Sequence, residues 1–140
     1  MPESEEHIKL VRFLIDYITR HHAQEFGLCV YADTSDAGRG DKPRPVDGYV
    51  PDVFVVTVPS SFTIIGEAKT FGDLATSRSR SQLRTFLRFL QYSNSPQMIL
   101  AVPLAARASA HGVLRALKRE VGATGVCTEV ITPVSRAVVG

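Results

Sequence analysis

Two apolar segments separated by a very short turn limit the fold of this chain more than any other feature of its sequence. Tyr49–Val58 is rich in β-branched residues and apolar on both faces, which predicts a strand inside a sheet. Pro59 and Ser60 then turn the chain, and Phe62–Lys69 is predicted as the next strand. A connection this short joins antiparallel neighbours, so we expect a β-hairpin.

Charged side chains interrupt both strands of this hairpin, where a core strand would be apolar. Asp52 stands near the start of the first strand, and Glu67 and Lys69 close the second. Burying an unpaired carboxylate is costly, so two acids and a lysine at these positions need a physical partner. The structural alternative is an ion pair between Lys69 and one of the acids, at the surface of a sheet edge.

The length of the turn decides which face of the sheet these charges share. If the turn has an even number of residues (59–60 or 58–61), residues opposite each other have numbers that sum to 119. Asp52 then faces Glu67, with Cβ atoms about 5 Å apart. Lys69 lies two residues beyond Glu67 and projects to the same face. An odd-length turn would place Asp52 on the wrong side.

Two carboxylates that face each other repel unless a positive charge lies between them. A hard divalent cation with oxygen ligands meets this need, and Mg²⁺ suits it best, with Mn²⁺ as a substitute. The sequence therefore predicts a cation site at the open end of the hairpin.

The rest of the chain supplies helices and strands in alternation. Helices are predicted over residues 5–23, from an N-cap at Ser79 to a break at Asn94, and over 106–121, and strands over Leu28–Ala32, Met98–Val102 and Val126–Ile131, with a loop over Phe71–Ser77. The order is α-β-β-β-α-β-α-β, and the helix after the third strand makes a parallel crossover. We expect one α/β domain over residues 1–140, a mixed four- to five-stranded sheet flanked by helices.

The charged residues of the hairpin also carry a resemblance to a known family. Pro51-Asp52, followed after fourteen intervening residues by Glu67-Ala68-Lys69, resembles the signature of the PD-(D/E)XK nuclease superfamily, the restriction-endonuclease-like fold. The α-β-β-β-α-β order over residues 5–102 is similar to the core of that family. The resemblance implies that Asp52, Glu67 and the Ala68 carbonyl bind a metal ion. It also implies that Lys69 positions or polarises the attacking water, which the metal activates.

Many members of this family add an acidic residue from the first helix. Glu6 lies four residues before Leu10 and eight before Leu14, on the side predicted to face inward, so it is a candidate metal ligand. The alternative is the helix dipole, which favours carboxylates at any helix N-terminus and explains Glu3 and Glu5 equally well.

A glutamine follows the Glu-x-Lys strand. Gln82 resembles the glutamine that several branches of the family, Holliday-junction resolvases among them, carry in the next helix, which implies a catalytic role. The competing interpretation is a capping box, in which Gln82 pairs with an N-cap at Ser79 and has no chemical role.

Arginines at a spacing of four form a ridge on the same helix. Arg80, Arg84 and Arg88 follow Arg78, and Asp73 is the only acidic residue between positions 70 and 119. This ridge suits contacts to the phosphates of DNA without base specificity. The alternative is an ordinary solvated helix face.

Composition excludes several other classes of protein. Cys29 and Cys127 are far apart in apolar stretches, which predicts small buried residues of a reduced compartment instead of a zinc site or a disulfide. The apolar runs are shorter than the roughly 18 residues of a membrane span. Residues 1–7 do not resemble a signal peptide. We therefore expect a cytoplasmic protein with no membrane partner.

The charge distribution is uneven although the net charge is only +2. Residues 1–69 carry 7 Lys and Arg against 11 Asp and Glu, whereas residues 70–140 carry 9 against 3. This arrangement suits an enzyme that holds a cation and binds a polyanion, although two solvated faces would look the same. The polar segment Asp33–Asp47 is either a basic loop that meets the substrate or a plain surface loop.

These features predict a Mg²⁺-dependent deoxyribonuclease that hydrolyses phosphodiester bonds with a metal-activated water. The first alternative is a DNA-binding or assembly module that keeps the fold and does not cleave. The second is an unrelated α/β interaction domain whose charges pair at the surface. The sequence leaves a homodimer and a larger complex both open.

Overall fold

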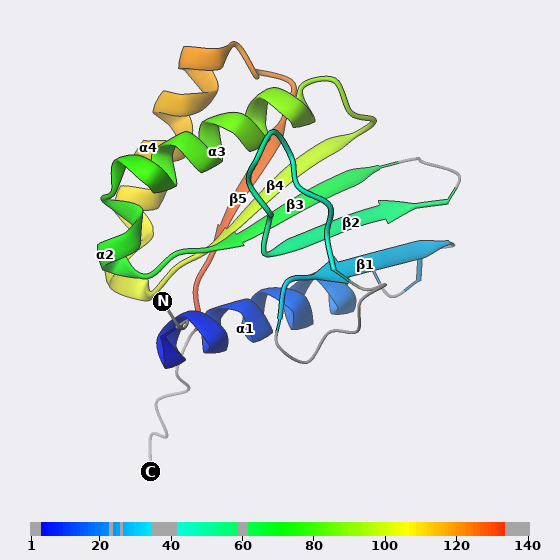
Figure 1. Cartoon of the computed structure of the whole chain (residues 1–140), viewed down its shortest axis with the longest axis horizontal. Helices are drawn as coiled ribbons and strands as arrows, with labels where there is room; N and C mark the ends of the chain where they lie inside the picture. The colour runs from blue at the N-terminus through cyan, green and yellow to red at the C-terminus, as the bar shows by residue number, and fades with distance from the viewer. Residues whose placement is uncertain (1–3, 23, 26, 35–41, 59–61, 134–140) are drawn as a thin grey trace.

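The elements of the fold follow the predicted order with two short additions. The computed structural model describes residues 4–22, 24–25, 27–34, 42–58 and 62–133 (Figure 1). Its elements are α1 (Glu5–His21), β1 (Leu28–Ala32), β2 (Val53–Thr57), β3 (Thr63–Ala68), α2 (Phe71–Leu74), α3 (Ser77–Leu90), β4 (Pro96–Ala101), the 3₁₀ helix η2 (Leu104–Ala106), α4 (Arg107–Val121) and β5 (Cys127–Ile131). The additions are α2 and η2, which the sequence patterns did not predict.

The strands form one five-stranded mixed sheet in the order β1-β2-β3-β4-β5. β1, β2 and β3 are antiparallel neighbours, and β4 and β5 continue the sheet parallel to β3. Val53 pairs with Gly66 and Phe54 with Ile65, so opposite numbers sum to 119. The predicted register is therefore confirmed, although the turn residues 59–61 lie outside the described part of the chain.

Helices cover both faces of the sheet, as expected for this class of fold. α1 packs on β2, β3 and β4 from one side, and α3 and α4 lie on the other (Figure 1). Side chains of β3 alternate between the two cores: Ile64 faces α1, and Ile65 faces α3 and α4. A Cβ at Gly66 would lie 3.0 Å from the Leu14 side chain, so a glycine lets α1 approach β3 closely. By the same alternation Glu67 points to the α3 side.

The strand predicted from residue 49 starts later than expected. β2 begins at Val53, and the preceding segment folds back on itself through an isolated bridge between Val46 and Tyr49. Asp47 and Gly48, with φ angles of 46° and 90°, make the turn within this bridge. Gly and Asp are among the residues that adopt positive φ most readily, which explains why a turn forms here.

The two cysteines differ from the expectation drawn from composition. Cys127 is exposed and Cys29 is half-buried, so the prediction that both are buried is wrong. Each cysteine stands on one of the two edge strands of the sheet, which among the described residues are paired on one side only. Among the described residues, no helix is long and apolar enough to cross a membrane.

Candidate active site

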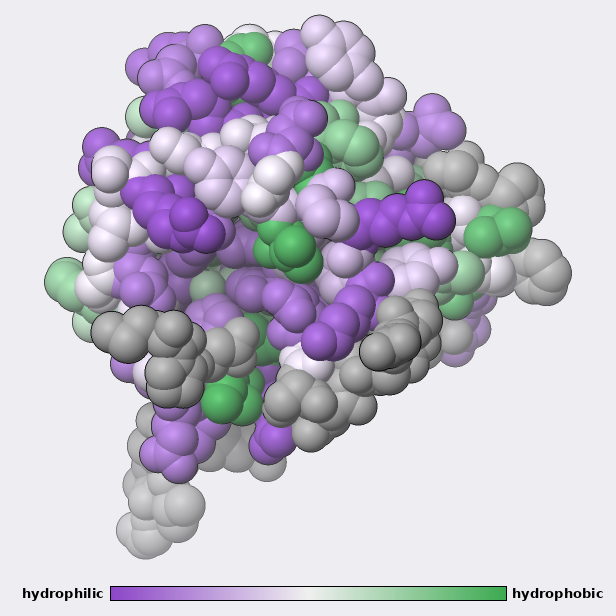
Figure 2. Space-filling view, viewed as in Figure 1, coloured by the Kyte–Doolittle hydropathy of each residue, from purple (hydrophilic) through white to green (hydrophobic). Residues whose placement is uncertain are grey.

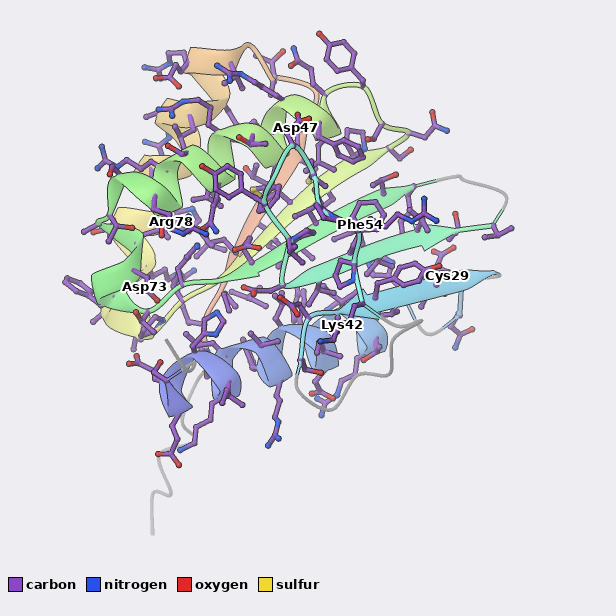
Figure 3. The ribbon with its side chains drawn as sticks, viewed as in Figure 1. Cys29, Lys42, Asp47, Phe54, Asp73 and Arg78 are labelled. Atoms are coloured by element: carbon purple, nitrogen blue, oxygen red, sulfur yellow. The ribbon has the colours of Figure 1, made fainter. Side chains whose placement is uncertain are left out.

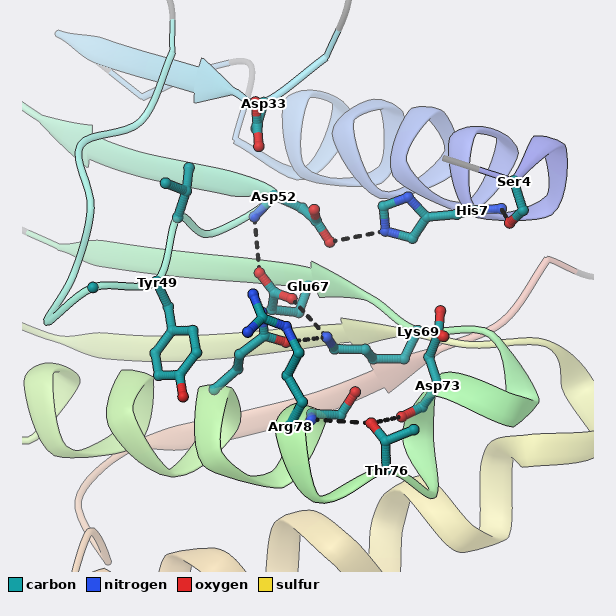
Figure 4. A pocket seen from close by; sticks show the side chains of 14 residues that line it. Ser4, His7, Asp33, Tyr49, Asp52, Glu67, Lys69, Asp73, Thr76 and Arg78 are labelled. Atoms are coloured by element: carbon teal, nitrogen blue, oxygen red, sulfur yellow. Dashed lines mark hydrogen bonds and ion pairs between the residues drawn. The ribbon is translucent and has the colours of Figure 1, made fainter. Parts of the chain in front are cut away.

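A cavity of about 730 Å³ opens where β3 ends and the chain enters β2. The first turns of α1 and α3 form two of its walls (Figure 4). The surface is hollowed at this place, and the hollow is largely hydrophilic (Figure 2). The acidic, basic and amide side chains that line it are those of His7, Asp33, Asp52, Glu67, Lys69, Asp73, Arg78 and Gln82.

Asp52 and Glu67 each bind the backbone of the other's strand. The Asp52 N–H donates to Glu67 Oε1 at 2.8 Å, and the Ala68 N–H donates to Asp52 Oδ2 at 2.8 Å. The β2–β3 ladder ends at Val53 opposite Gly66, so these carboxylates take over where backbone pairing stops. Asp52 is 8% exposed and Glu67 2%. This burial rules out the alternative of an ion pair at the protein surface.

Lys69 lies between an acid and an amide. Its Nζ is 3.5 Å from Glu67 Oε2 and donates a hydrogen bond to Gln82 Oε1 (Figure 4). Lys69 is itself 8% exposed, so both partners compensate a nearly buried ammonium. The structure therefore brings together four of the predicted residues: Asp52, Glu67, Lys69 and Gln82.

The predicted capping box is wrong, and this correction explains the position of Gln82. α3 begins at Ser77, and its N-cap is Thr76, whose side chain accepts from the Ser79 N–H at 3.1 Å. Ser79 is therefore a buried residue inside the helix. Gln82 stands in the second turn, where its side chain accepts from Lys69, and Thr76 caps the helix.

The charge inside the cavity is not balanced. Desolvation and the nearby charge of Asp52 raise the pKa of Glu67 to about 8, and Lys69 lowers it only in part. A carboxyl group that is hard to ionise at neutral pH marks a place where a further cation would be stabilised. Perturbed carboxyl groups lining a cavity are common at functional sites.

The donor groups of this cavity fit a hard divalent cation. Asp52 and Glu67 supply carboxylate oxygens, the ligands that Mg²⁺ and Mn²⁺ prefer. Pro51 would stand opposite Ala68 if the register continued, and it has no N–H to donate to the Ala68 carbonyl. Within the described residues, no three His, Cys, Asp or Glu side chains are grouped closely enough to hold a metal by themselves. Mg²⁺ usually keeps several water ligands and needs only one or two carboxylates, so two acids suffice.

Glu6 does not take the predicted position in the site. It is exposed and lines a separate pocket beside Lys9 and Leu104. The buried stripe of α1 includes Val11 and Leu14, and Glu6 lies to its side because each residue turns the helix by about 100°. The prediction that Glu6 faces inward is therefore wrong.

His7 takes the place predicted for Glu6. It stands four residues before Val11, so it continues the buried stripe to the end of α1. Its Nε2 lies 3.4 Å from Asp52 Oδ2, and Ser4 caps the helix by accepting from the His7 N–H at 3.1 Å. The spacing of the apolar residues of α1 is the signal that identifies His7 as an inward-facing residue. The prediction of Glu6 rested instead on its acidic side chain.

Arg78 is the member of the predicted arginine ridge that reaches the cavity. It is exposed, and its guanidinium lies 5.5 Å from the centre of the Tyr49 ring, within the range of a cation–π contact. Tyr49 in turn packs edge-on against Phe86. The turn before β2 therefore holds a cation at the rim of the site.

The other arginines of the ridge lie away from the cavity. Arg80 and Arg88 are exposed and do not line it. Arg84 forms an ion pair with Glu120 of α4, and this pair lowers the pKa of the Glu120 carboxyl. The expectation of a ridge without neutralising acids is therefore wrong at Arg84, because its partner comes from a distant helix that packs on α3.

Comparisons of the chain with protein-family models, with characterised proteins and with solved structures found no match. The basis for a functional proposal is therefore the cavity itself: two buried acids, a buried lysine, an amide and an arginine at its rim.

Proposed function

We propose that this protein is a metal-dependent nuclease of the PD-(D/E)XK type that hydrolyses phosphodiester bonds of DNA. The observation that carries the proposal is the pairing of Asp52 and Glu67, two buried acids from adjacent strands that open into one cavity with Lys69. The α-β-β-β-α-β order of the first six long elements supports the same interpretation, since it is similar to the core of the restriction-endonuclease-like fold.

In this proposal a metal would be held at the open end of the hairpin. Asp52 and Glu67 would hold it through carboxylate oxygens, and the Ala68 carbonyl would be the third protein ligand. A bound divalent ion lowers the pKa of a coordinated water and stabilises negative charge on phosphoryl oxygens. The raised pKa of Glu67 supports this assignment, because a nearby cation would favour its ionised form.

Lys69 and Gln82 act on the phosphate and the water. The Lys69 ammonium supplies fixed positive charge close to Glu67, where negative charge develops on the phosphate. Gln82 accepts a hydrogen bond from Lys69 and so fixes the direction of its Nζ. Arg78, exposed at the rim, binds a phosphate next to the one that is hydrolysed.

A cleavage assay tests the proposal. Purified protein is incubated with linear, supercoiled and branched DNA in Mg²⁺ or Mn²⁺, or in EDTA, and Asp52→Asn is compared with wild type. Asp16→Asn is the matched control, because Asp16 is an exposed acid of α1 that pairs with Arg20 at 2.9 Å. We expect products only with metal, from wild type and from Asp16→Asn. Equal cleavage by Asp52→Asn would refute the assignment.

The alternative of a DNA-binding module that does not cleave has one observation in its favour. The acid predicted to come from α1, Glu6, points away from the cavity, so fewer carboxylates face the proposed metal than in many members of the family. This alternative predicts DNA binding that survives in EDTA, with no metal-dependent product from wild type in the same assay.

A further inference from the structure

A second cavity lies on the part of the sheet that α3 and α4 leave uncovered. α3 packs mainly on β3 and β4, and α4 on β5, so in the described part of the chain these helices cover β1 and β2 less than the other strands. The segment before β2 crosses this area instead and encloses a cavity of about 720 Å³. Its walls include Lys42 and Arg44 from that segment.

Aromatic side chains form the floor of this second cavity. Tyr31 comes from β1, Phe54 from β2 and Phe89 from the last turn of α3 (Figure 3 labels Phe54 and Lys42). The Phe54 and Phe89 ring centres are 6.1 Å apart and the rings are tilted by 56°. Phe89 is 37% exposed, so part of its ring remains accessible from the cavity. Partly exposed rings of this kind are surfaces on which planar groups stack.

The charge of the second cavity is positive. Lys42 and Arg44 are both exposed, and no acidic side chain is among the described residues that line the cavity. Within the described part of the chain, neither cation forms an ion pair. The ligand that complements this surface is therefore planar and aromatic, and carries negative charge close to its rings.

The two cavities lie next to each other along one segment of chain. Lys42 and Val46 line this second cavity, which we call the aromatic cavity. Gly48–Val50 lines the first cavity, which contains Asp52 and Glu67 and which we call the acidic cavity. The Val46–Tyr49 bridge holds these two parts of the segment together. A chain molecule that leaves the acidic cavity over this segment enters the aromatic cavity next.

We infer that the aromatic cavity binds unpaired nucleotides of the strand whose phosphodiester lies in the acidic cavity. This inference rests on the proposed function and adds a substrate class to it: DNA with a single-stranded portion, such as a frayed end, a flap or a branch. Bases in a duplex are stacked on each other, whereas unpaired bases stack on protein aromatic rings while basic residues bind the backbone. The five residues that carry the inference are Tyr31, Lys42, Arg44, Phe54 and Phe89.

The chain contains no tryptophan, which gives a direct test. Phe89→Trp places a single indole at an accessible position of the aromatic cavity. A single-stranded oligothymidylate of about twelve nucleotides is titrated in EDTA, so that binding is measured without cleavage. We expect quenching of the tryptophan emission by this probe and at least tenfold weaker quenching by a blunt duplex of the same length.

Alanine variants made in the Phe89→Trp background test whether Lys42 and Arg44 bind the backbone of the oligonucleotide. Lys42→Ala with Arg44→Ala should weaken the affinity for oligothymidylate about tenfold or more and should lower its salt dependence. Arg107→Ala with Arg119→Ala is the control, because these exposed arginines of α4 give the same change in net charge away from both cavities. Equal losses of affinity in the two double variants would overturn the inference, since the effect would then be one of overall charge.

Other occupants of the cavity give different results. Quenching by polyglutamate as strong as by oligothymidylate would overturn the inference in favour of an acidic peptide, and emission that changes with protein concentration alone would do so in favour of a second copy of the chain. If oligothymidylate leaves the emission unchanged while metal-dependent cleavage persists, the inference fails and the nuclease proposal stands. Quenching of the emission by oligothymidylate, with no DNA cleavage in the presence of any metal, would refute the nuclease proposal. Binding of single-stranded DNA would then remain as the function.

Discussion

Asp52 and Glu67 are joined crosswise between their strands: the Asp52 N–H donates to the Glu67 carboxylate, and the Asp52 carboxylate accepts from the N–H of Ala68, the residue after Glu67. Only one oxygen of each carboxylate takes part in these two hydrogen bonds, and the second Glu67 oxygen faces Lys69 at 3.5 Å. This arrangement gives two carboxyl groups a fixed, buried position at the open end of a hairpin.

The structural role of Asp52 can be separated from its proposed chemical role. Asp52→Asn keeps an oxygen that accepts from the Ala68 N–H, whereas Asp52→Ala leaves this buried donor without its partner. We expect Asp52→Ala to lower the free energy of unfolding by about 1–3 kcal/mol and Asp52→Asn by clearly less. Urea denaturation without divalent metal measures both values. Equal destabilisation by the two variants would contradict a stabilising role of the hydrogen bond between the Ala68 N–H and Asp52.

The pKa of Glu67 makes stability depend on pH in a definite direction. Because the pKa of Glu67 is about 8 in the folded protein and the ordinary pKa of a glutamate is 4.5, the folded state binds more protons than the unfolded state between these values. The contribution of Glu67 to the free energy of unfolding is therefore present at acidic pH and is lost as pH rises from about 4.5 to about 8. Glu67→Gln, which does not ionise, should remove this part of the pH dependence.

Denaturation in EDTA at a series of pH values measures the difference between wild type and Glu67→Gln. We expect the stability advantage of Glu67→Gln to grow by more than about 1 kcal/mol between pH 5 and pH 8. A constant difference across this range would show that Glu67 titrates normally. Mg²⁺ should reduce the advantage at pH 8, since it favours the ionised carboxylate of wild type.

Gln82 orients Lys69 in the proposed mechanism. Gln82→Met removes the acceptor for the Lys69 ammonium and keeps a side chain of similar length. We expect the cleavage rate to fall about tenfold for Gln82→Met and by about 10²–10³ for Lys69→Met, which removes the charge itself. Single-turnover cleavage measures both rates. A loss in Gln82→Met that equals the loss in Lys69→Met would assign Gln82 a direct role in the reaction.

The arginines of α3 should differ in their effect on DNA. Arg78→Ala removes the cation at the rim of the acidic cavity, so we expect weaker binding to every DNA sequence and a salt slope reduced by about one. Arg84→Ala breaks an ion pair with Glu120 at a distance from the cavity, and we expect little change in DNA affinity. Fluorescence anisotropy at several salt concentrations compares the two. A larger loss of affinity in Arg84→Ala would restore the predicted phosphate-binding ridge.

The central part of the site could be predicted because it follows from local rules. The parity of the turn fixes the register, the register places Asp52 opposite Glu67, and strand alternation adds Lys69. None of these steps needs information about the packing of distant segments. The fold class followed in the same way from the order of helices and strands.

The errors arose where tertiary contacts decide between local alternatives. Ser79 and Thr76 both suit an N-cap, and Thr76 takes this position directly after α2, in which Leu74 is buried. Arg84 pairs with Glu120, which lies 36 residues further along the chain on α4. The sequence pattern does not reveal how this helix packs against α3. Glu6 and His7 are adjacent, and a turn of about 100° between them separates a surface residue from one that faces Asp52.

The electron paramagnetic resonance signal of free Mn²⁺ falls as the ion binds to protein. A titration monitored by this signal shows whether Asp52 and Glu67 hold a metal. We expect one bound Mn²⁺ per chain in wild type and in Asp16→Asn, displaced by excess Mg²⁺, and no site of comparable affinity when Asp52→Asn and Glu67→Gln are combined. Binding of the same strength in that double variant, or none in wild type with single-stranded DNA present, would contradict this expectation.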